Sequence, residues 1–428
     1  MRIAIIGAGI VGVTSAYELA AQGHEVTVFE RHGSVASDAS FAHGGLLHPG
    51  WPSALQPAAG VLAQPAWQWS AWRARKHRAH AEHQLQAQRL ALLSQARLQH
   101  WRQELRLDYE RADGVLLLLR TARELKAAQA GAAALTALDI KHEWLDASQC
   151  LRVEPGLCPD TALQGGLHLP QAEVGNGRQF AHLLKAEAQR LGVRFRFHTT
   201  VRRIDAGSAP ALLHEYTPPA QGTTPAARAE EKGRADSGPD TVPMPMEPQQ
   251  EHFDAIVVCA AMGADALLRP LGLKLPMASL HGHSITAPLR QFEAHPDLGP
   301  RAGLLDLAQR VSLSRQGLRV RVAGAMAMGT APARAPAAAM AELHKVLHDW
   351  FPGAAHLASV QAWSGSVPLL PDGLPLLGES GQAGVWLNLG HGASGWALAC
   401  GSAKALAERI AGRAAPTEIS SLGLLRLG

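Results

Sequence analysis

The sequence predicts an α/β protein, α+β overall, in which a Rossmann-type dinucleotide-binding domain is combined with a second domain built on a mainly antiparallel sheet. Three observations predict this fold. A strand, a glycine-rich turn, a helix and a second strand follow one another at the N-terminus. A second strand–glycine–helix turn lies near the C-terminus. Between them, several short apolar runs are typical of the strands of another sheet.

The N-terminal turn has the residue spacing of a dinucleotide-binding fingerprint. An apolar strand, Arg2–Ile6, leads into Gly7-Ala8-Gly9-Ile10-Val11-Gly12, a helix over 10–22 and a strand over 25–29. Gly7 permits the tight turn, Gly9 lets the backbone approach a pyrophosphate, and Gly12 lets the helix pack against the strand. The start of the helix presents free N–H groups to the phosphates. Glu30 is in place for the ribose hydroxyls, and its carboxylate argues against NADP.

The segment after Glu30 indicates FAD rather than NAD. It is small, polar and rich in glycine, and it can run along an extended ligand, whereas a simple NAD enzyme would start its next helix here. Only one copy of the fingerprint occurs, which suffices for a chain that binds its own FAD. From this segment we assign six residues to the cofactor site: Arg31, Ser40, His43, Gly44, Gly45 and Leu46.

The C-terminal turn is predicted to seat the flavin ring. A strand over 385–389 is followed by Gly390-His391-Gly392-Ala393-Ser394-Gly395 and a helix over 396–410. The N-terminus of that helix can meet the negative charge that reduced flavin carries around N1 and the C2 carbonyl. A turn with only a packing role is the alternative. Small residues at the end of the buried strand over 253–260 also allow a ligand to approach. The further cofactor candidates are Val201, Ala260, Gly263 and Gly365.

The middle of the chain predicts the domain organisation. We assign 1–50, 170–270 and 360–428 to the FAD-binding domain, and 51–169 and 271–359 to the substrate domain. The stretch 207–252 contains 8 prolines and cannot build a core, so we expect a disordered insertion there, set in a surface hairpin.

Composition excludes several function classes. The net charge of +4 over 428 residues is no nucleic-acid signature. The four cysteines have neither zinc-ligand nor C-x-x-C spacing, so we expect no metal site. No apolar run is long enough to span a membrane, and the apolar stretch near the N-terminus is too short for that of a signal peptide. We therefore expect a cytoplasmic protein. The basic, helical stretch 67–101 is either a solvated surface or a contact with anionic lipid on the inner face of the plasma membrane.

Taken together, these motifs resemble the D-amino-acid oxidase superfamily of flavoproteins, and most closely its bacterial D-amino-acid dehydrogenase branch. The resemblance rests on the opening through Glu30-Arg31, on segments 40–50, 165–170 and 193–197, on Pro371-Asp372-Gly373, and on 387–402. It implies non-covalent FAD, transfer of the substrate α-hydrogen as hydride to flavin N5, an imine that becomes a 2-oxo acid plus ammonia, and a membrane quinone as electron acceptor. The sequence predicts no oligomeric state.

Two positions depart from the family pattern. The family's Gly-x-Arg-Pro arginine, which pairs with the substrate carboxylate, corresponds here to Val367, and a tyrosine of the family corresponds to His283. A valine cannot bind a carboxylate. Either Arg310 or Arg315 supplies the charge, or His48, His283 and His391 do, or the substrate is not an ordinary free amino acid.

We therefore name His391, His283, Arg310 and His48 as candidate catalytic residues. The leading interpretation is oxidation of the C–N bond of a small amino acid. The alternatives are a secondary amine, glycine-like or hydroxy-acid substrate on the same fold, and a flavin-binding partner protein without catalysis.

Overall fold

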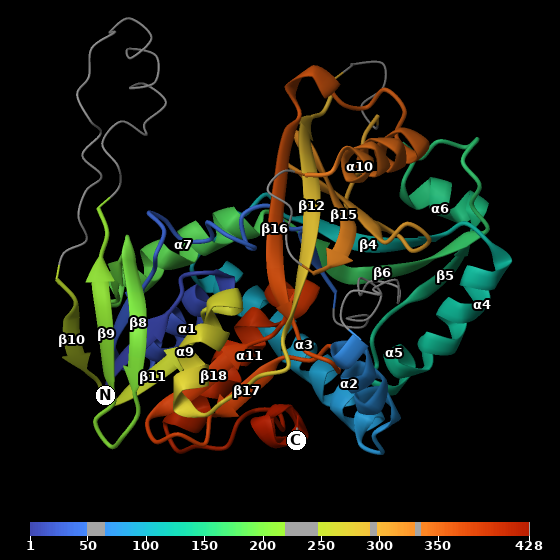
Figure 1. Cartoon of the computed structure of the whole chain (residues 1–428). Coiled ribbons are helices and arrows are strands. Elements are labelled where there is room, and N and C mark those ends of the chain that lie inside the picture. Colours follow the sequence, from blue (N-terminus) through green and yellow to red (C-terminus); the bar gives the residue numbers. More distant parts are fainter. Residues whose placement is uncertain (49–64, 219–246, 292–297, 330–334, 428) are drawn as a thin grey trace, which may run out of the picture.

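The computed structural model describes residues 1–48, 65–218, 247–291, 298–329 and 335–427. Within them the chain forms two bodies, each organised around its own sheet (Figure 1). The mixed α/β fold and the second, mainly antiparallel sheet confirm the predicted fold class.

The first body contains a six-stranded sheet that is parallel except at one edge, where β17 runs antiparallel to β18. The strand order places the N-terminal strand in the middle, between the next strand in sequence, residues 25–29, and a strand from a distant part of the chain, residues 255–258. In sheet order the strands are β17 (Leu376–Glu379), β18 (Val385–Leu389), β11 (Ala255–Val258), β1 (Arg2–Ile6), β2 (Glu25–Phe29) and β7 (Arg194–Arg196).

Both faces of this sheet are covered because the side chains of β1 alternate between two cores. Ile3 and Ile5 pack towards a layer of helices, whereas Ala4 and Ile6 face a three-stranded antiparallel sheet. The helices are α1 (Ile10–Ala21), α7 (Gly177–Arg190), α3 (His80–Glu104) and α11 (Gly395–Ile410). The small sheet contains β8 (Thr199–Asp205), β9 (Ala211–Tyr216) and β10 (Gln249–His252), with α9 (Ala264–Leu268) beside it.

The second body contains a sheet of nine strands in which β13 and β4 form the one parallel pair among the pairings of the described residues. Along the sheet the strands are β16 (Gln361–Leu369), β12 (Ala278–Pro288), β15 (Arg319–Met328), β14 (Val311–Gln316), β13 (Gly303–Asp306), β4 (Ala112–Leu119), β6 (Gly165–Val174) and β3 (Leu46–Leu47), with β5 (Glu143–Asp146) paired to β6. The strand β6 continues past residue 170, where the sequence suggested a domain boundary.

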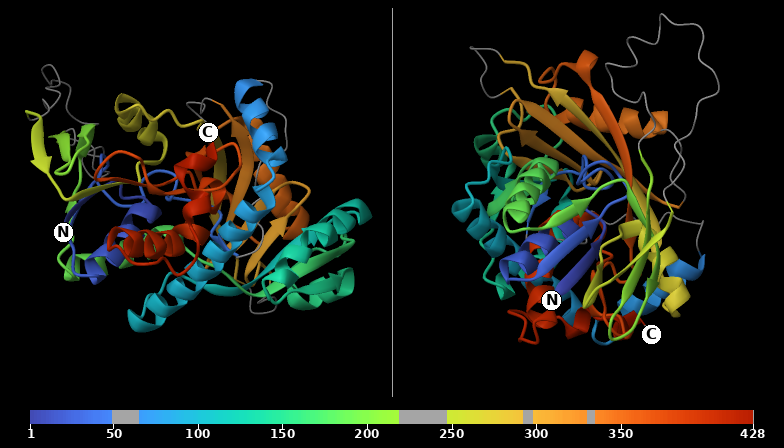
Figure 2. Two further views of the ribbon diagram at one scale, coloured as in Figure 1. Left: turned by 90° about the horizontal axis from the view of Figure 1, so that it is seen from below. Right: turned by 90° about the vertical axis from the view of Figure 1, so that its left-hand side faces the viewer.

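The remaining helices surround this second sheet. Helix α10 covers one face of it in Figure 1, α4 to α6 lie at its far end, and α2 lies below. They are α2 (Pro65–Lys76), α4 (Ala122–Gly131), α5 (Ala133–Ala137), α6 (Ala147–Val153) and α10 (Ala337–Trp350). Seen from below in Figure 2, α3 runs obliquely across the molecule between the two bodies. No helix of the described segments is both long and apolar enough to cross a membrane.

The sheet pleat gives the second body one apolar and one partly polar face. Val311 and Leu313 of β14 pack towards α10. Ser312 and Ser314 alternate with them and face the other way, towards the turn at 43–45, where a Cβ added to Gly44 would lie 2.3 Å from the Ser312 Oγ. The glycines therefore let the chain of the first body lie directly on this sheet.

The prediction of a disordered insertion over 207–252 is wrong at both of its ends. Ala211–Tyr216 and Gln249–His252 form antiparallel strands β9 and β10, because apolar residues such as Leu212 pack onto the back of the six-stranded sheet. The proline-rich centre of the insertion, 219–246, lies outside the described residues.

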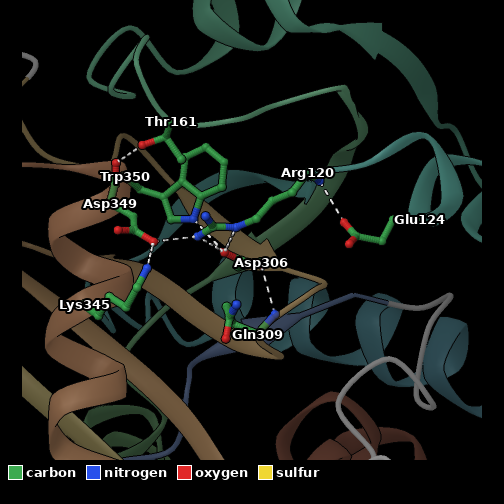
Figure 3. A network of polar contacts seen from close by, with 8 residues as sticks. All are labelled: Arg120, Glu124, Thr161, Asp306, Gln309, Lys345, Asp349 and Trp350. Atoms are coloured by element: carbon green, nitrogen blue, oxygen red, sulfur yellow. Dashed lines mark hydrogen bonds and ion pairs between the residues drawn. The ribbon is translucent and has the colours of Figure 1, made fainter.

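A buried ion-pair network joins three elements of the second body (Figure 3). Arg120, which follows β4, donates from Nε and Nη2 to Asp306 Oδ2 at 2.8 and 2.6 Å, and from Nη2 to Asp349 Oδ2 at 3.1 Å. The Trp350 indole also donates to Asp306 Oδ2, at 2.8 Å. Asp306 is fully buried, so its charge depends on Arg120.

Replacing Arg120 with methionine is expected to destabilise the protein by about 3–5 kcal/mol, because Asp306 is then a buried carboxylate without a cation. Urea denaturation followed by far-UV circular dichroism measures the change. Lys345→Met is the matched control: Lys345 pairs with Asp349 at the surface, and its loss should cost at most about 1 kcal/mol. Equal losses in the two variants would contradict a dependence of Asp306 on Arg120.

Candidate active site

Two adjoining hollows follow the segment after Glu30. The N-terminal hollow, of about 330 Å³, lies at the carboxyl ends of β1, β2 and β11. The central cavity, of about 100 Å³, lies between the 39–46 segment and the nine-stranded sheet. Ala39 lines both, so the two form one elongated site.

The glycine turn opens the N-terminal hollow. Gly7 has φ +101°, and a Cβ there would lie 2.7 Å from the Cys259 carbonyl oxygen. A Cβ on Gly12 would lie 1.9 Å from the Gly7 carbonyl oxygen, so this residue sets the close packing of α1 on β1. Gly9 lines the hollow, and the nearest atom to a Cβ there is the Ser40 Oγ at 3.6 Å. The two outer glycines thus serve the backbone, while Gly9 leaves room for a ligand.

Glu30 and Ser40 sit where the turn meets the hollow. Glu30 Oε2 accepts from the Ala8 N–H at 2.7 Å, and Oε1 accepts from the His32 N–H at 2.8 Å. The Ile10 N–H, first in α1, donates to the Ser40 Oγ at 3.1 Å. These contacts hold a carboxylate and a hydroxyl beside the positive end of a helix, which suits ribose hydroxyls and phosphates.

The predicted cofactor residues fall into three groups. The N-terminal hollow is lined by Gly7, Gly9, Glu30, Arg31, Ser40, Val201, Ala260 and Gly263. The central cavity is lined by His43, Gly44, Gly45, Leu46, Gly365 and Ala393. The others line neither of the two hollows: Ile10, Val11, Gly12, Gly390, His391, Gly392, Ser394 and Gly395.

The start of α11 faces the central cavity. Ala393 and Trp396, on either side of the first residue of this helix, both line the cavity. No side chain caps this helix start, and the Trp396 Nε1 is buried without a hydrogen-bond partner among the described residues. Free N–H donors and the positive end of a helix dipole are therefore available to an electron-rich ligand.

The residues present fit FAD, because the site is long and has a distinct group for each part of the cofactor. Gly9 and the start of α1 would hold the pyrophosphate, and Glu30 would hold the ribose. The turn at 43–46 and the start of α11 would hold the flavin ring. When bound, FAD supplies a two-electron acceptor. Among the described residues no group of His, Cys, Asp and Glu is arranged to hold a metal ion.

The candidate catalytic residues are not brought together. His283 lines the central cavity, and its Nδ1 lies 2.7 Å from the Ser364 Oγ. His48 lies apart, in a small hollow between β3 and α3. Arg310 lies in the turn between β13 and β14; its carbonyl oxygen approaches Gly324 of the cavity wall, but Arg310 is not a lining residue.

His391 is buried within the turn at 390–395. Its Nε2 lies 3.0 Å from the Ser402 Oγ, which itself donates to the Leu398 carbonyl oxygen, so His391 Nε2 carries the proton. Burial lowers the pKa of His391 to about 3. The residue is therefore neutral and ties the turn to α11.

Stability is expected to fall in acid because His391 is buried in the neutral form. With an unfolded pKa near 6.5 and a folded pKa of about 3, the unfolded state binds the proton more readily. The stabilisation is complete above pH 6.5 and is lost as the pH falls towards 3, by about 2 kcal/mol at pH 5. In His391→Gln, which can still donate to Ser402, this loss should shrink.

Urea denaturation at pH 7 and pH 5 measures the effect. His100→Gln is the control, because His100 is an exposed residue of α3. If the wild-type protein and His391→Gln lose stability in parallel between the two pH values, His391 is not the source of the acid sensitivity.

Several site residues were missed by sequence reasoning. Trp363 of β16, Leu280 of β12 and Met326 of β15 line the central cavity, and none has a motif. Trp363 stacks on Phe41, with ring centroids 6.3 Å apart, and the Arg178 guanidinium lies over the Phe41 ring, 4.0 Å from its centroid. Only the adjacency of Trp363 to Gly365 could have indicated it.

Comparisons with known proteins show the family and the fold of the chain. The model of the FAD dependent oxidoreductase family matches residues 2–409. A D-amino acid dehydrogenase of Cereibacter sphaeroides is 34% identical over the whole of this chain and 95% of its own length. The solved structures of glycine oxidase from Geobacillus kaustophilus and L-proline dehydrogenase from P. horikoshii share the fold. Each has a TM-score of 0.74 and covers 99% of this chain, at 19% and 15% identity. The chain belongs to the FAD dependent oxidoreductase family.

Proposed function

We propose that this protein oxidises the C–N bond of a small amino-acid-type substrate, as a D-amino-acid dehydrogenase-like enzyme. The observation that carries the proposal is the elongated site, in which the N-terminal hollow and the central cavity share the lining residue Ala39. The name of the relatives that are 34% identical adds the substrate class. FAD, when bound, would supply the two-electron acceptor: the substrate would give up its Cα hydrogen as hydride and an N–H proton, and the resulting imine would be hydrolysed to a carbonyl compound and ammonia.

The chain's own contribution is to keep the substrate amine unprotonated and shielded from water. No Asp or Glu is among the described residues that line the central cavity. An ammonium group is destabilised in such surroundings, so the bound amine loses its proton and its lone pair can assist the departure of the hydride. Trp363, which lines the cavity, stacks on Phe41, and we expect these rings to reduce the access of water to the bound amine.

Anaerobic bleaching of the bound flavin tests the proposal without assuming an electron acceptor. The panel contains D-amino acids, their L-enantiomers, secondary amines and hydroxy acids. Bleaching by D-amino-acid-type amines is expected. Bleaching by hydroxy acids or L-enantiomers alone would contradict the proposal, and so would a flavin that dithionite reduces but no member of the panel does.

We also propose that α2 contacts an anionic membrane surface, where a quinone could accept the electrons. Trp69 and Trp72, one turn apart, are 58% and 54% exposed. Arg73, Arg75 and Lys76 form the last turn of the same helix, and no acidic residue occurs from 65 to 81. Exposed indoles beside cations suit the headgroup region of anionic lipid.

Sedimentation with lipid vesicles tests this contact. Vesicles containing phosphatidylserine should bind the protein, and purely zwitterionic vesicles should bind it less. The double substitution Trp69→Ser and Trp72→Ser should weaken the binding while leaving flavin bleaching unchanged. Equal binding of the double variant and the wild type would exclude α2 as the contact surface.

A further inference from the structure

The end of the central cavity formed by β12, β15 and β16 is apolar. Leu280 of β12 is the cross-strand partner of Val367 on β16, and Met326 of β15 lines the same end. No lysine or arginine is among the described residues of the cavity wall.

The two histidines of the wall add hydrogen bonds but no charge. Burial and, secondarily, the charge of Arg321 lower the pKa of His43 to about 3. Burial and the neighbouring His281 lower the pKa of His283. His43 Nδ1 already accepts from the Gly45 N–H at 3.0 Å, and His283 Nδ1 is engaged with Ser364. At neutral pH both rings are uncharged.

The arginines near the cavity are directed elsewhere. Arg321 of β15 is buried, but its Nε donates to the Thr286 Oγ1 at 3.0 Å and its Nη1 lies 3.5 Å from the His43 carbonyl oxygen. Arg315 donates to the carbonyl oxygens of Gly317 and Pro300, at 3.1 and 3.3 Å. Neither arginine is part of the cavity wall.

We propose that the substrate carries an uncharged group where an amino acid carries its α-carboxylate, and that this group faces Val367. The substrate is then an amino-acid derivative without a free carboxylate. An amide, an ester or the corresponding simple amine has this chemistry. A carboxylate moved from water to a position against this wall would lose its hydration, and no positive charge would compensate for that loss. This inference rests on the proposed function and names the substrate class of the same site. For an amide, the Cα–H leaves as hydride to the flavin, an N–H proton is released, and hydrolysis of the imine gives a 2-oxo amide and ammonia.

The test compares three reductants that share one side chain. Anaerobic titration of the FAD-loaded wild-type protein measures the apparent Kd for flavin bleaching by D-leucine, D-leucinamide and 3-methylbutan-1-amine. The Kd of the amide and of the simple amine should be at least about tenfold lower than that of D-leucine. The amine of 3-methylbutan-1-amine is at least as basic as that of D-leucine, so a preference for both compounds is not an effect of basicity.

Each outcome decides the inference. If D-leucine bleaches the flavin at an equal or lower concentration than D-leucinamide, the inference fails while the proposed function stands. If no compound bleaches a flavin that dithionite reduces, the proposed function fails. Arg321→Met identifies the reason for the first outcome: if D-leucine is preferred and this variant loses that preference, while the amide is unaffected, Arg321 supplies the missing charge.

Discussion

Val367→Arg is expected to switch the enzyme towards free amino acids. Val367 lines the central cavity beside Leu280, so an arginine there places its guanidinium at the apolar end of the cavity. The apparent Kd of D-leucine for flavin bleaching should fall at least about tenfold, because a guanidinium and a carboxylate form a charge-assisted pair in surroundings that exclude water. The Kd of D-leucinamide should rise, since an uncharged group leaves the new cation without a partner.

The same substitution should make stability depend on the substrate. A guanidinium at the apolar end of the cavity without an anion destabilises the fold, so the Tm of Val367→Arg should drop and should recover when D-leucine is added under anaerobic conditions. Val367→Leu is the matched control, because it changes bulk without charge and should affect both reductants alike. A Val367→Arg protein that retains its flavin but binds D-leucine no better than the wild type would show that the carboxyl position lies elsewhere.

Gly9→Val is expected to yield a folded protein without FAD. The backbone at Gly9, with φ −65° and ψ 177°, is open to any residue, and the nearest atom to a Cβ there is 3.6 Å away. The valine therefore disturbs little within the protein. It does occupy the N-terminal hollow, where the backbone must approach the pyrophosphate. Affinity for FAD should fall by more than about 100-fold, or about 2.7 kcal/mol.

The ratio of flavin absorbance to protein, measured after incubation with excess FAD, tests this prediction, and far-UV circular dichroism checks the fold. Gly12→Val provides the contrast, because a Cβ there would lie 1.9 Å from the Gly7 carbonyl oxygen and should prevent folding itself. If Gly9→Val binds FAD normally, the pyrophosphate does not pass this residue, and the assignment of the N-terminal hollow is wrong.

Local patterns were enough to predict the cofactor side of the molecule. The strand, glycine turn and helix from Arg2 to Ala21 occupy consecutive residues, and two of the glycine requirements are local: Gly7 has φ +101°, and Gly12 packs against the Gly7 carbonyl oxygen. The same holds for the C-terminal turn before α11. The insertion was misjudged at its ends because its composition is dominated by the centre, whereas Leu212 is held by packing onto a distant sheet.

The sequence by itself determined the cofactor: the Gly7–Gly12 turn with Glu30, the segment to Leu46 and the turn at 390–395 each carry their chemistry in neighbouring residues. Only the tertiary structure decided the substrate side. The cavity wall takes one to three residues from each of several strands, and the tertiary arrangement of those strands determines which residues face inwards. Whether Arg310, Arg315 or Arg321 replaces the arginine absent at Val367 depends on side-chain directions that no spacing along the chain records.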